Sequence, residues 1–373
     1  MAGAVIVAAG RTAVAPRGGA FRTLEIHQLA RPVIAGLLSE TGLRAEQVGE
    51  IILANALGGG GNPARLAALD AGLPESVAGL SIDRQCCGGM DAVLLADALI
   101  RAGRFDVVIA GGAESYSRRP LRLRTDPAGG PATPYDQPPF TPWPGRDPDM
   151  AAAAEAIARA LGISRAEQDA WAVASHARAR AEAARLRAEI RPLAGQISDG
   201  FTRALTPALA ARGPAITGSI SVANTAVAAD GAAFCLLVSE ALARRLGLDG
   251  ARIVAGATLG ADPALPGLAP VPAIREVLAG AGLRPADLAA IEIMEAFAVQ
   301  AMACVRLAGL PEARVNRGGG ALARGHPIGA SGAINLARLY HDLRRGGGGA
   351  GLAAIAAAGG LGTALVLRSP GSW

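Results

Sequence analysis

Two short segments rich in small residues lie in opposite halves of this chain, and each leads directly into an apolar helical pattern. The first, Arg84–Met90, precedes the helical pattern Asp91–Ala102. The second, Arg324–Ala333, precedes the pattern Ala333–Leu343 and carries a histidine where the first carries a cysteine. The two halves therefore look like copies of one strand-and-helix unit, and this repeat constrains the fold more than any other feature.

The residues at the matching positions, Cys86 and His326, are candidates for chemistry. A thiol at the start of a helix lies at the positive end of the peptide dipoles, which is expected to lower its pKa and raise its thiolate fraction. His326 precedes Pro327, which disfavours helix at the histidine and places the ring on an extended segment at a helix entrance. A buried, unreactive cysteine and a structural histidine are the alternatives. The other histidines, His27, His176 and His341, are expected to be solvated.

Apolar strand-like runs alternate with helical patterns along most of the chain, which predicts mixed sheets covered by helices. Examples are Ala4–Ala8 followed by Thr23–Glu40, and the closing pair Gly351–Ile355 and Gly362–Leu367. From about Ser117 to Ala215 the sequence turns to arginines, prolines and polar turns, so we expect an insertion that covers the site. The predicted division is 1–116 plus 216–245, an inserted loop domain 117–215, and 246–373.

Composition excludes several classes of function. The net charge of +5 comes from scattered arginines without interleaved aromatics, which argues against nucleic-acid binding. Four cysteines without CxxC spacing argue against a zinc site or disulfide framework and indicate a reducing, cytoplasmic location. The uncharged run from Gly346 to Leu367 is interrupted by glycines, so no membrane span is predicted.

Several ordered blocks together resemble the thiolase family, from Met1 to nearly the C-terminus. They are Asn62-Pro63-Ala64-Arg65, Arg84–Gly89 with Gly111-Gly112-Ala113-Glu114-Ser115, Glu295-Ala296-Phe297-Ala298, and Gly318–Gly332 with Gly359-Gly360. The resemblance implies a five-layered α-β-α-β-α thiolase fold of two similar α/β halves with an inserted loop domain. It also implies a homodimer or homotetramer that acts on acyl-CoA, with the coenzyme A thioester as substrate and with no separate cofactor or metal.

The resemblance also implies roles for individual residues. Cys86 matches the family's acyl-accepting cysteine, and His326 matches the histidine of its GHP motif. The positions expected to meet the coenzyme A arm are Met150, Ala226, Ala296 and Phe297. Arg118, Arg119, Arg122 and Arg124 are placed to meet its phosphates, or else form a solvated basic face.

The departures from the family pattern concern the second half-reaction. Met294 stands where the family has an asparagine that holds a water, and Ala356 stands where it has a second cysteine that moves the α-proton of the acceptor. Neither a thioether nor a methyl group donates a proton. Asp149 replaces a histidine, and Ala226 replaces a serine near the pantetheine.

These residues predict a thiolase-like acyltransferase that forms an acyl-enzyme on a cysteine. Because two groups are replaced, three alternatives within catalysis stay open: an acyl-CoA hydrolase, acyl transfer to a non-carbon acceptor, and decarboxylative condensation. Cys304 could take the place of the missing acid. An alternative of another class is a non-catalytic CoA-binding or scaffold subunit, and a partner subunit could supply the missing groups.

Overall fold

In the computed structural model, each half of the chain builds the same four-stranded pattern. The structure describes residues 3–369, so residues 1–2 of the predicted first half and 370–373 of the predicted second half lie outside the described residues. The strands of the first half are β1 (Ala4–Arg11), β3 (Glu50–Ala54), β5 (Val107–Glu114) and β10 (Ala229–Ser239). Those of the second half are β11 (Ala251–Gly260), β12 (Leu288–Ile293), β13 (Gly349–Ala357) and β14 (Leu361–Ser369).

The strand order is β3-β5-β10-β1 in the first half and β12-β13-β14-β11 in the second. In both, the first pair is parallel and the next two are antiparallel. The halves therefore share one topology, and the repeat read from the sequence is confirmed. Two short strands extend the first half, β4 (Leu80–Ile82) beyond β3 and β2 (Ala15–Pro16) beside β10. A two-residue contact between β1 and β11 joins both halves into one ten-stranded sheet.

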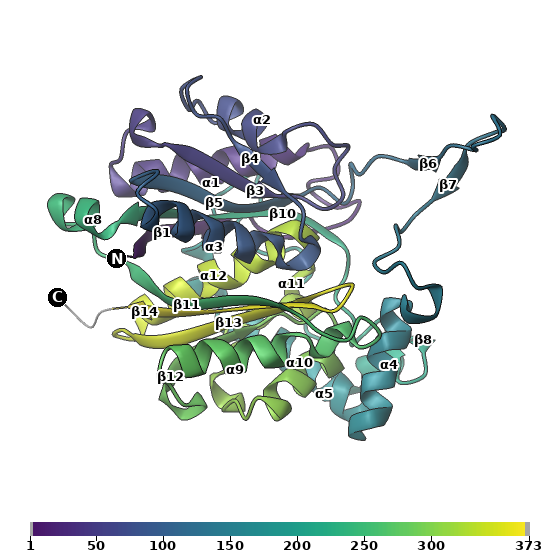
Figure 1. Ribbon diagram of the computed structural model, residues 1–373. Helices are drawn as coiled ribbons and strands as arrows, with labels where there is room; N and C mark the ends of the chain where they lie inside the picture. Colours follow the sequence, from purple (N-terminus) through teal and green to yellow (C-terminus); the bar gives the residue numbers. More distant parts are fainter. Residues whose placement is uncertain (1–2, 370–373) are drawn as a thin grey trace.

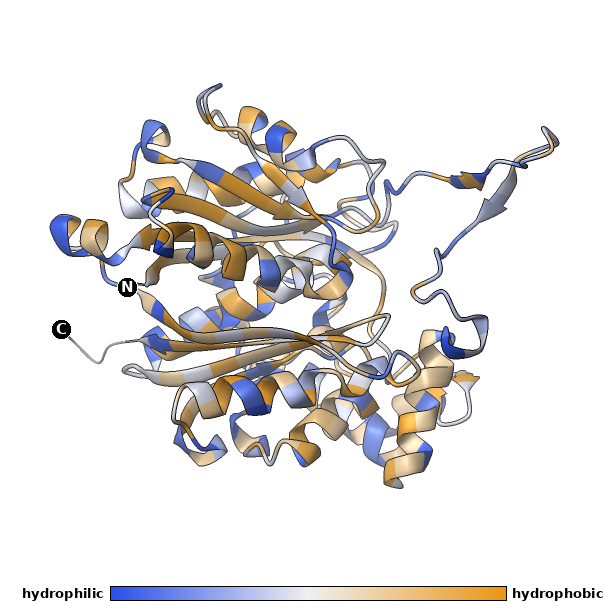
Figure 2. Ribbon diagram, viewed as in Figure 1, coloured by the Kyte–Doolittle hydropathy of each residue, from blue (hydrophilic) through white to orange (hydrophobic). Residues whose placement is uncertain are grey.

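Helices cover both outer faces and fill the space between the halves, giving five layers (Figure 1). The outer helices of the first half are α1 (Ile26–Thr41) and α2 (Pro63–Asp70), and those of the second are α9 (Pro270–Gly280) and α10 (Ala298–Leu307). The central layer consists of α3 (Gly88–Arg101) and α12 (Ile328–Arg345). The apolar residues lie on the strands and on the helix faces turned toward them (Figure 2). Three large apolar cores result: one under the outer helices of each half, and one around the central helices between the two halves.

Glycines let the two central helices approach at their N-terminal ends. A Cβ on Gly89 would lie 2.7 Å from the carbonyl oxygen of Gly329, and one on Gly332 would lie 2.6 Å from the backbone nitrogen of Met90. Both distances are below any carbon contact that real side chains make, and the obstructing atoms are backbone. Side chains larger than hydrogen are therefore excluded here, and the segments that precede α3 and α12 are brought together.

The segment between β5 and β10 carries four helices and two small hairpins. The hairpins are β6 (Arg122–Arg124) with β7 (Thr133–Tyr135), and β8 (Ala215–Thr217) with β9 (Ile220–Ser221). The helices are α4 (Met150–Leu161), α5 (Arg165–Ala181), α6 (Ala183–Arg187) and α7 (Pro207–Ala211). The β6–β7 hairpin projects from the body as an arm (Figure 1), whereas α4 and α5 pack against α10.

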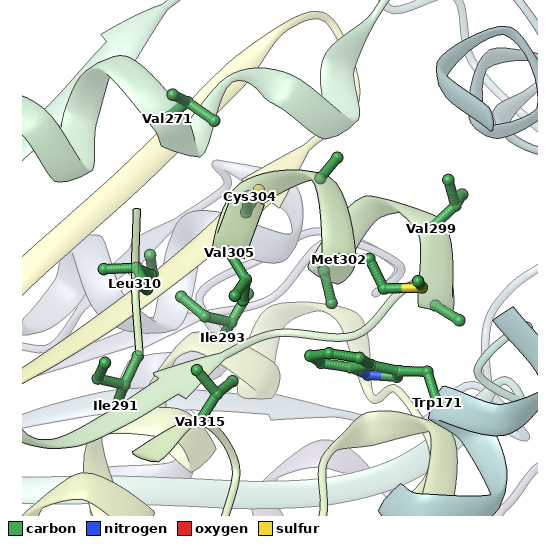
Figure 3. Packing of buried hydrophobic residues seen from close by; sticks show 14 of the residues in the cluster. Trp171, Val271, Ile291, Ile293, Val299, Met302, Cys304, Val305, Leu310 and Val315 are labelled. Carbon is green, nitrogen blue, oxygen red and sulfur yellow. The ribbon is translucent and has the colours of Figure 1, made fainter. Parts of the chain in front are cut away.

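Trp171 of α5 anchors this packing, because it lies beside Met302 of α10 in the apolar cluster that also holds Cys304 (Figure 3). On the same helix the sequence-based expectation for His176 was wrong. The ring is buried, its Nδ1 accepts a hydrogen bond from the backbone of Arg203, and burial lowers its pKa to about 4. The remaining short helices are α8 (Glu240–Leu246) and α11 (Ala321–Arg324). Across residues 3–369, no helix combines the length and the apolar character needed to cross a bilayer.

Candidate active site

Cys86 and His326 lie in contact at the point where the two central helices begin. Cys86 belongs to a single 3-10 turn, Gln85–Cys87, that runs directly into α3. The turn starts at Gln85, which adopts the left-handed φ of +50° that non-glycine residues rarely take. His326 is held by a backbone hydrogen bond to the carbonyl of Val227, 2.8 Å long. The sulfur of Cys86 lies 3.2 Å from Nε2 of His326, so a proton can pass between them.

Ser331 fixes the orientation of the imidazole from the first turn of α12. Its Oγ lies 2.6 Å from Nδ1 of His326 and donates a 3.3 Å hydrogen bond to the carbonyl oxygen of Pro327. With its hydroxyl proton directed to Pro327, Oγ can accept a hydrogen bond from the Nδ1 of a neutral ring that is protonated at this nitrogen. The lone pair of Nε2 then faces the thiol, which is the arrangement that a general base requires.

Burial acts against the expectation of a low thiol pKa at the helix start, because it shifts the pKa of both groups toward their neutral forms. Burial and, after it, the nearby carboxylate of Glu114 raise the pKa of Cys86 to about 12. Burial likewise lowers the pKa of His326 to about 3, with the Arg324 guanidinium acting in the same direction. The dipoles of α3 therefore do not outweigh the effect of desolvation on the pKa of the Cys86 thiol.

Glu114 holds the surroundings of this pair in place. Its carboxylate accepts hydrogen bonds from the backbone of Ala56 and Leu57 and from the side chain of Asn55, all on the loop after β3. It also accepts a 3.0 Å hydrogen bond from the backbone of Gly329, at the start of α12. One carboxylate at the end of β5 thus ties the two halves together beside the site, and burial raises its pKa to about 7.

All six predicted site residues line one pocket of about 490 Å³. Cys86 and His326 come from opposite halves, and Met150 comes from α4 of the inserted segment. The other three are Ala226, Ala296 and Phe297. The backbone of Ala226 donates a 2.9 Å hydrogen bond to the carbonyl of Ala296, so these wall segments are paired.

Of the residues that depart from the family pattern, some line the pocket and others lie outside it. Ala356, at the end of β13, lines the pocket and presents a methyl group. Met294 is buried in the apolar core between the layers and lies outside the pocket lining. Asp149 caps α4 by accepting hydrogen bonds from the backbone of its first turn. Cys304 is buried against the carbonyl of Gly267 and its sulfur does not line the pocket, so the structure does not bring it to Cys86.

The other charged candidates divide into structural and pocket groups. Glu295 accepts four hydrogen bonds from the Trp171 indole, the Ser175 hydroxyl, the Asn316 amide and the backbone of Leu322, which makes it an orienting group. Two of the four clustered arginines, Arg119 and Arg122, line the pocket. Arg118 instead pairs with Glu25, and Arg124 stacks on Tyr135 of the arm. Among residues 3–369 no group of three or more potential ligand side chains is arranged to hold a metal ion.

Sequence reasoning missed the roles of Ser331 and Glu114, although both lie inside the quoted blocks. Each is a polar residue in a run of glycine and alanine that packs tightly, where every side-chain oxygen must find a partner. That pattern was the available signal.

Comparisons with known proteins agree with this arrangement. Residues 4–241 match the family described as thiolase, N-terminal domain, and residues 248–369 match thiolase, C-terminal domain. The chain is 42% identical to an acetyl-CoA acetyltransferase of Pseudomonas aeruginosa, over 97% of this chain and 98% of that protein. It is 40% identical to the putative acetyl-CoA C-acetyltransferase YhfS of Bacillus subtilis, over 98% and 99%. The crystal structure of the Bacillus anthracis acetyl-CoA acetyltransferase superposes with a TM-score of 0.93 at 33% identity, covering 99% of both chains.

Proposed function

The chain is a member of the thiolase family and an acyltransferase of acyl-CoA thioesters, and from this premise we propose that Cys86 carries the acyl group and that His326 is its proton partner. The single observation that carries the proposal is the 3.2 Å contact between the sulfur of Cys86 and Nε2 of His326, an imidazole whose Nδ1 is in contact with Ser331. A scaffold subunit that only binds acyl-CoA has no need for that contact.

The first half-reaction follows from the neutral resting pair. Nε2 of His326 takes the thiol proton as the sulfur of Cys86 attacks the thioester carbonyl. The carbonyl oxygen becomes negative near the first peptide groups of α3, whose dipoles stabilise it. The bond between the carbonyl carbon and the sulfur of coenzyme A then breaks, the imidazolium returns its proton to that sulfur, and the acyl group remains on Cys86.

The second half-reaction has one base in contact with the reacting sulfur among the described residues. Ala356 contributes a methyl group to the pocket wall, and Met294 lies behind the wall. His326 therefore removes the proton of the acceptor as well as that of Cys86. We infer that carbon–carbon bond formation proceeds at this single imidazole, which also serves the reverse reaction, cleavage of a 3-ketoacyl-CoA by coenzyme A.

The experiment that tests the proposal is mass spectrometry of the peptide containing Cys86 after incubation with acetyl-CoA. We expect a gain of one acetyl group in the wild type, none in Cys86→Ala, and a slow gain in His326→Ala. Acyl-CoAs of short, medium and branched chains extend the test. If no acyl-CoA adds mass to the wild-type peptide, the proposal is wrong.

The methyl group of Ala356 gives a specific reason to measure a second outcome, release of the acyl group to water or to another oxygen or nitrogen nucleophile. His326 would activate such a nucleophile in the same way as the thiol. Product analysis with acetyl-CoA, acetoacetyl-CoA and malonyl-CoA separates hydrolysis, condensation and decarboxylative condensation, because each leaves a different product.

We also propose that the chain works as a homodimer or homotetramer in a reducing, cytoplasmic environment. The strand β4 is an outer edge of the sheet, and beside it the leucines Leu66, Leu69 and Leu80 are 50%, 43% and 40% exposed. Exposed edges with apolar neighbours favour pairing with another chain. All four cysteines are free thiols, which fits reducing conditions. Light scattering of the purified protein measures the number of copies.

A further inference from the structure

A buried arginine lies two residues before His326 and forms no ion pair among residues 3–369. Arg324 ends α11, and only 4% of its surface is exposed. Its guanidinium donates a 3.1 Å hydrogen bond to the carbonyl of Gly319 and a 3.2 Å hydrogen bond to Oδ1 of Asn335. Both acceptors are uncharged, so the positive charge of Arg324 has no carboxylate in contact with it.

The guanidinium of Arg324 closes the loop that carries His326. Gly319 lies just before α11 and Asn335 lies in α12, so the two hydrogen bonds tie together the ends of the segment 319–335. His326 lies between these ends, as does Ser331, which contacts its Nδ1. The guanidinium is therefore held in place by the same stretch of backbone that positions the imidazole.

The carboxyl groups of the same buried cluster do not neutralise this charge. Asp199 and Glu189 both accept hydrogen bonds from Arg11. Glu292 interacts electrostatically with Arg324, but burial raises the pKa of Glu292 to about 8, so this carboxyl group is mostly protonated at neutral pH. A buried cation without a carboxylate partner costs stability, and an uncharged side chain of similar size would avoid that cost. Folding alone therefore does not explain a charge at this position.

The charges around the pair of Cys86 and His326 oppose transfer of the proton from sulfur to nitrogen. Burial and, after it, the carboxylates of Glu114 and Asp83 raise the pKa of the thiol. Burial and, after it, the guanidinium of Arg324 lower the pKa of the imidazole. A thiolate–imidazolium pair would be stabilised by the reverse arrangement, with the cation beside the sulfur and the carboxylates beside the ring.

The other elements packed against the imidazole present no charge to it. The start of α12 contributes the hydroxyl of Ser331. The segment 224–228, whose Ala228 forms a backbone bridge with His326, contains no titratable side chain. Arg324 is therefore the charged group that acts on the imidazole side of the pair.

We propose that Arg324 is a positioning residue for His326, whose charge disfavours a proton on the imidazole and so leaves the proton on Cys86 until a thioester carbonyl is in place. This inference rests on the proposed function, since it concerns the pair that carries the acyl group there. The consequence is selectivity. A neutral thiol reacts poorly with small electrophiles, whereas a bound thioester presents its carbonyl to the sulfur while Nε2 takes the proton.

The test is the titration of His326, followed by NMR of its imidazole in wild type, Arg324→Gln, Arg324→Lys and the control Arg317→Gln. Arg317 is an exposed arginine just before the same loop, and the His326 signal is assigned by its absence from His326→Ala. We expect a midpoint near pH 3 in wild type. The midpoint in Arg324→Gln should be about one pH unit or more higher, whereas Arg324→Lys, which keeps the charge, and Arg317→Gln should stay within about half a unit of wild type.

Alkylation of Cys86 by iodoacetamide gives a second measure, because the thiolate is the species that reacts. At acid pH the thiolate comes from the ion pair with His326, and removal of the charge of Arg324 favours that pair. Arg324→Gln should therefore be alkylated roughly tenfold faster than wild type at about pH 5, which is the effect of one pH unit in the titration of the imidazole. Arg324→Lys should match wild type.

Equal shifts of the His326 midpoint in Arg324→Gln and Arg324→Lys would assign the effect to packing and overturn the inference, as would no shift in Arg324→Gln. If the glutamine variant does not fold, Arg324→Met removes the charge with a side chain of similar length. A wild-type midpoint at or above the ordinary value of 6.5 overturns the inference without any variant.

Incubation of the same proteins with acetyl-CoA separates this inference from the proposed function. Failure of wild type to acetylate Cys86 refutes the proposed function and this inference with it. Acetylation of wild type together with an unchanged midpoint in Arg324→Gln refutes only the role of Arg324.

Discussion

Alkylation of Cys86 by iodoacetamide should rise with pH from about 6 to about 10 without reaching a plateau. The pKa of about 12 means that about one thiol in ten thousand is ionised at pH 8, whereas a thiol with the ordinary value of 9.0 would be about one-tenth ionised. The thiolate is the species that alkylates. Cys86 should therefore react about a thousandfold more slowly than an unhindered thiol of ordinary pKa at this pH, with a tenfold gain per pH unit.

The assay is the rate of carbamidomethylation of the Cys86 peptide at a series of pH values, with Cys86→Ser as the blank. The other three cysteines are buried and serve as an internal background. A rate that stays constant below about pH 7 would refute the reasoning. Such a profile is typical of a preformed thiolate–imidazolium pair, in which the attraction between the two charges outweighs the cost of their desolvation.

The same reasoning separates alkylation from acylation in His326→Ala. Alkylation draws on the small thiolate population set by bulk pH, so loss of the imidazole should change it little. Acylation near neutral pH needs the proton to leave as the carbonyl is attacked, and loss of the base should slow it by roughly 10²–10⁴-fold. Equal effects on both reactions would mean that His326 acts only through the electrostatics of the resting thiol.

Three further changes test other parts of the structure. Ala356→Cys should raise the rate of acetoacetyl-CoA cleavage by coenzyme A, followed by loss of acetoacetyl-CoA absorbance, by about tenfold or more without changing acetylation of Cys86; an unchanged rate would contradict this. Gly332→Ala places a methyl group against the backbone of Met90, so it should destabilise the fold by about 1–3 kcal/mol or more, measured by denaturant unfolding. Because it separates α3 from α12, it should also slow the acylation of Cys86. Burial raises the pKa of Glu292 to about 8, so its contribution to stability is present below its ordinary value of 4.5 and is lost as pH rises through 8. The melting temperature of wild type should therefore fall more than that of Glu292→Gln between pH 6 and 9. Parallel curves of melting temperature against pH would refute the raised pKa of Glu292.

The repeat and the positions of its strands and helices were predictable because each rests on local pattern, whereas the five-layer order was implied by the resemblance to the thiolase family. The expected closing strands Gly351–Ile355 and Gly362–Leu367 are the cores of β13 and β14, which pair antiparallel. The helical pattern Asp91–Ala102 corresponds to α3, which begins three residues earlier at Gly88. Apolar periodicity and glycine position encode these features, so sequence alone was sufficient.

The electrostatics were not predictable, because burial depends on contacts far apart in the chain. The helix start suggests a low pKa for Cys86, yet burial in the pocket and, after it, Glu114 from β5 raise this pKa. His176 sits among polar neighbours in sequence, but the fold buries it beneath Arg203 and Phe201.

The loading half of the chemistry and the acceptor half are separable in this structure. The nucleophile and its base are held by the close approach of α3 and α12 and by the Glu114 carboxylate, none of which involves Ala356 or Met294. Those two positions lie at the end of β13 and just after β12, on the second half alone. Substitution there alters how the acceptor is activated and leaves acyl loading in place, because the shared group, His326, takes its orientation from Ser331. A thiolase fold can therefore change its second reactant while keeping its first.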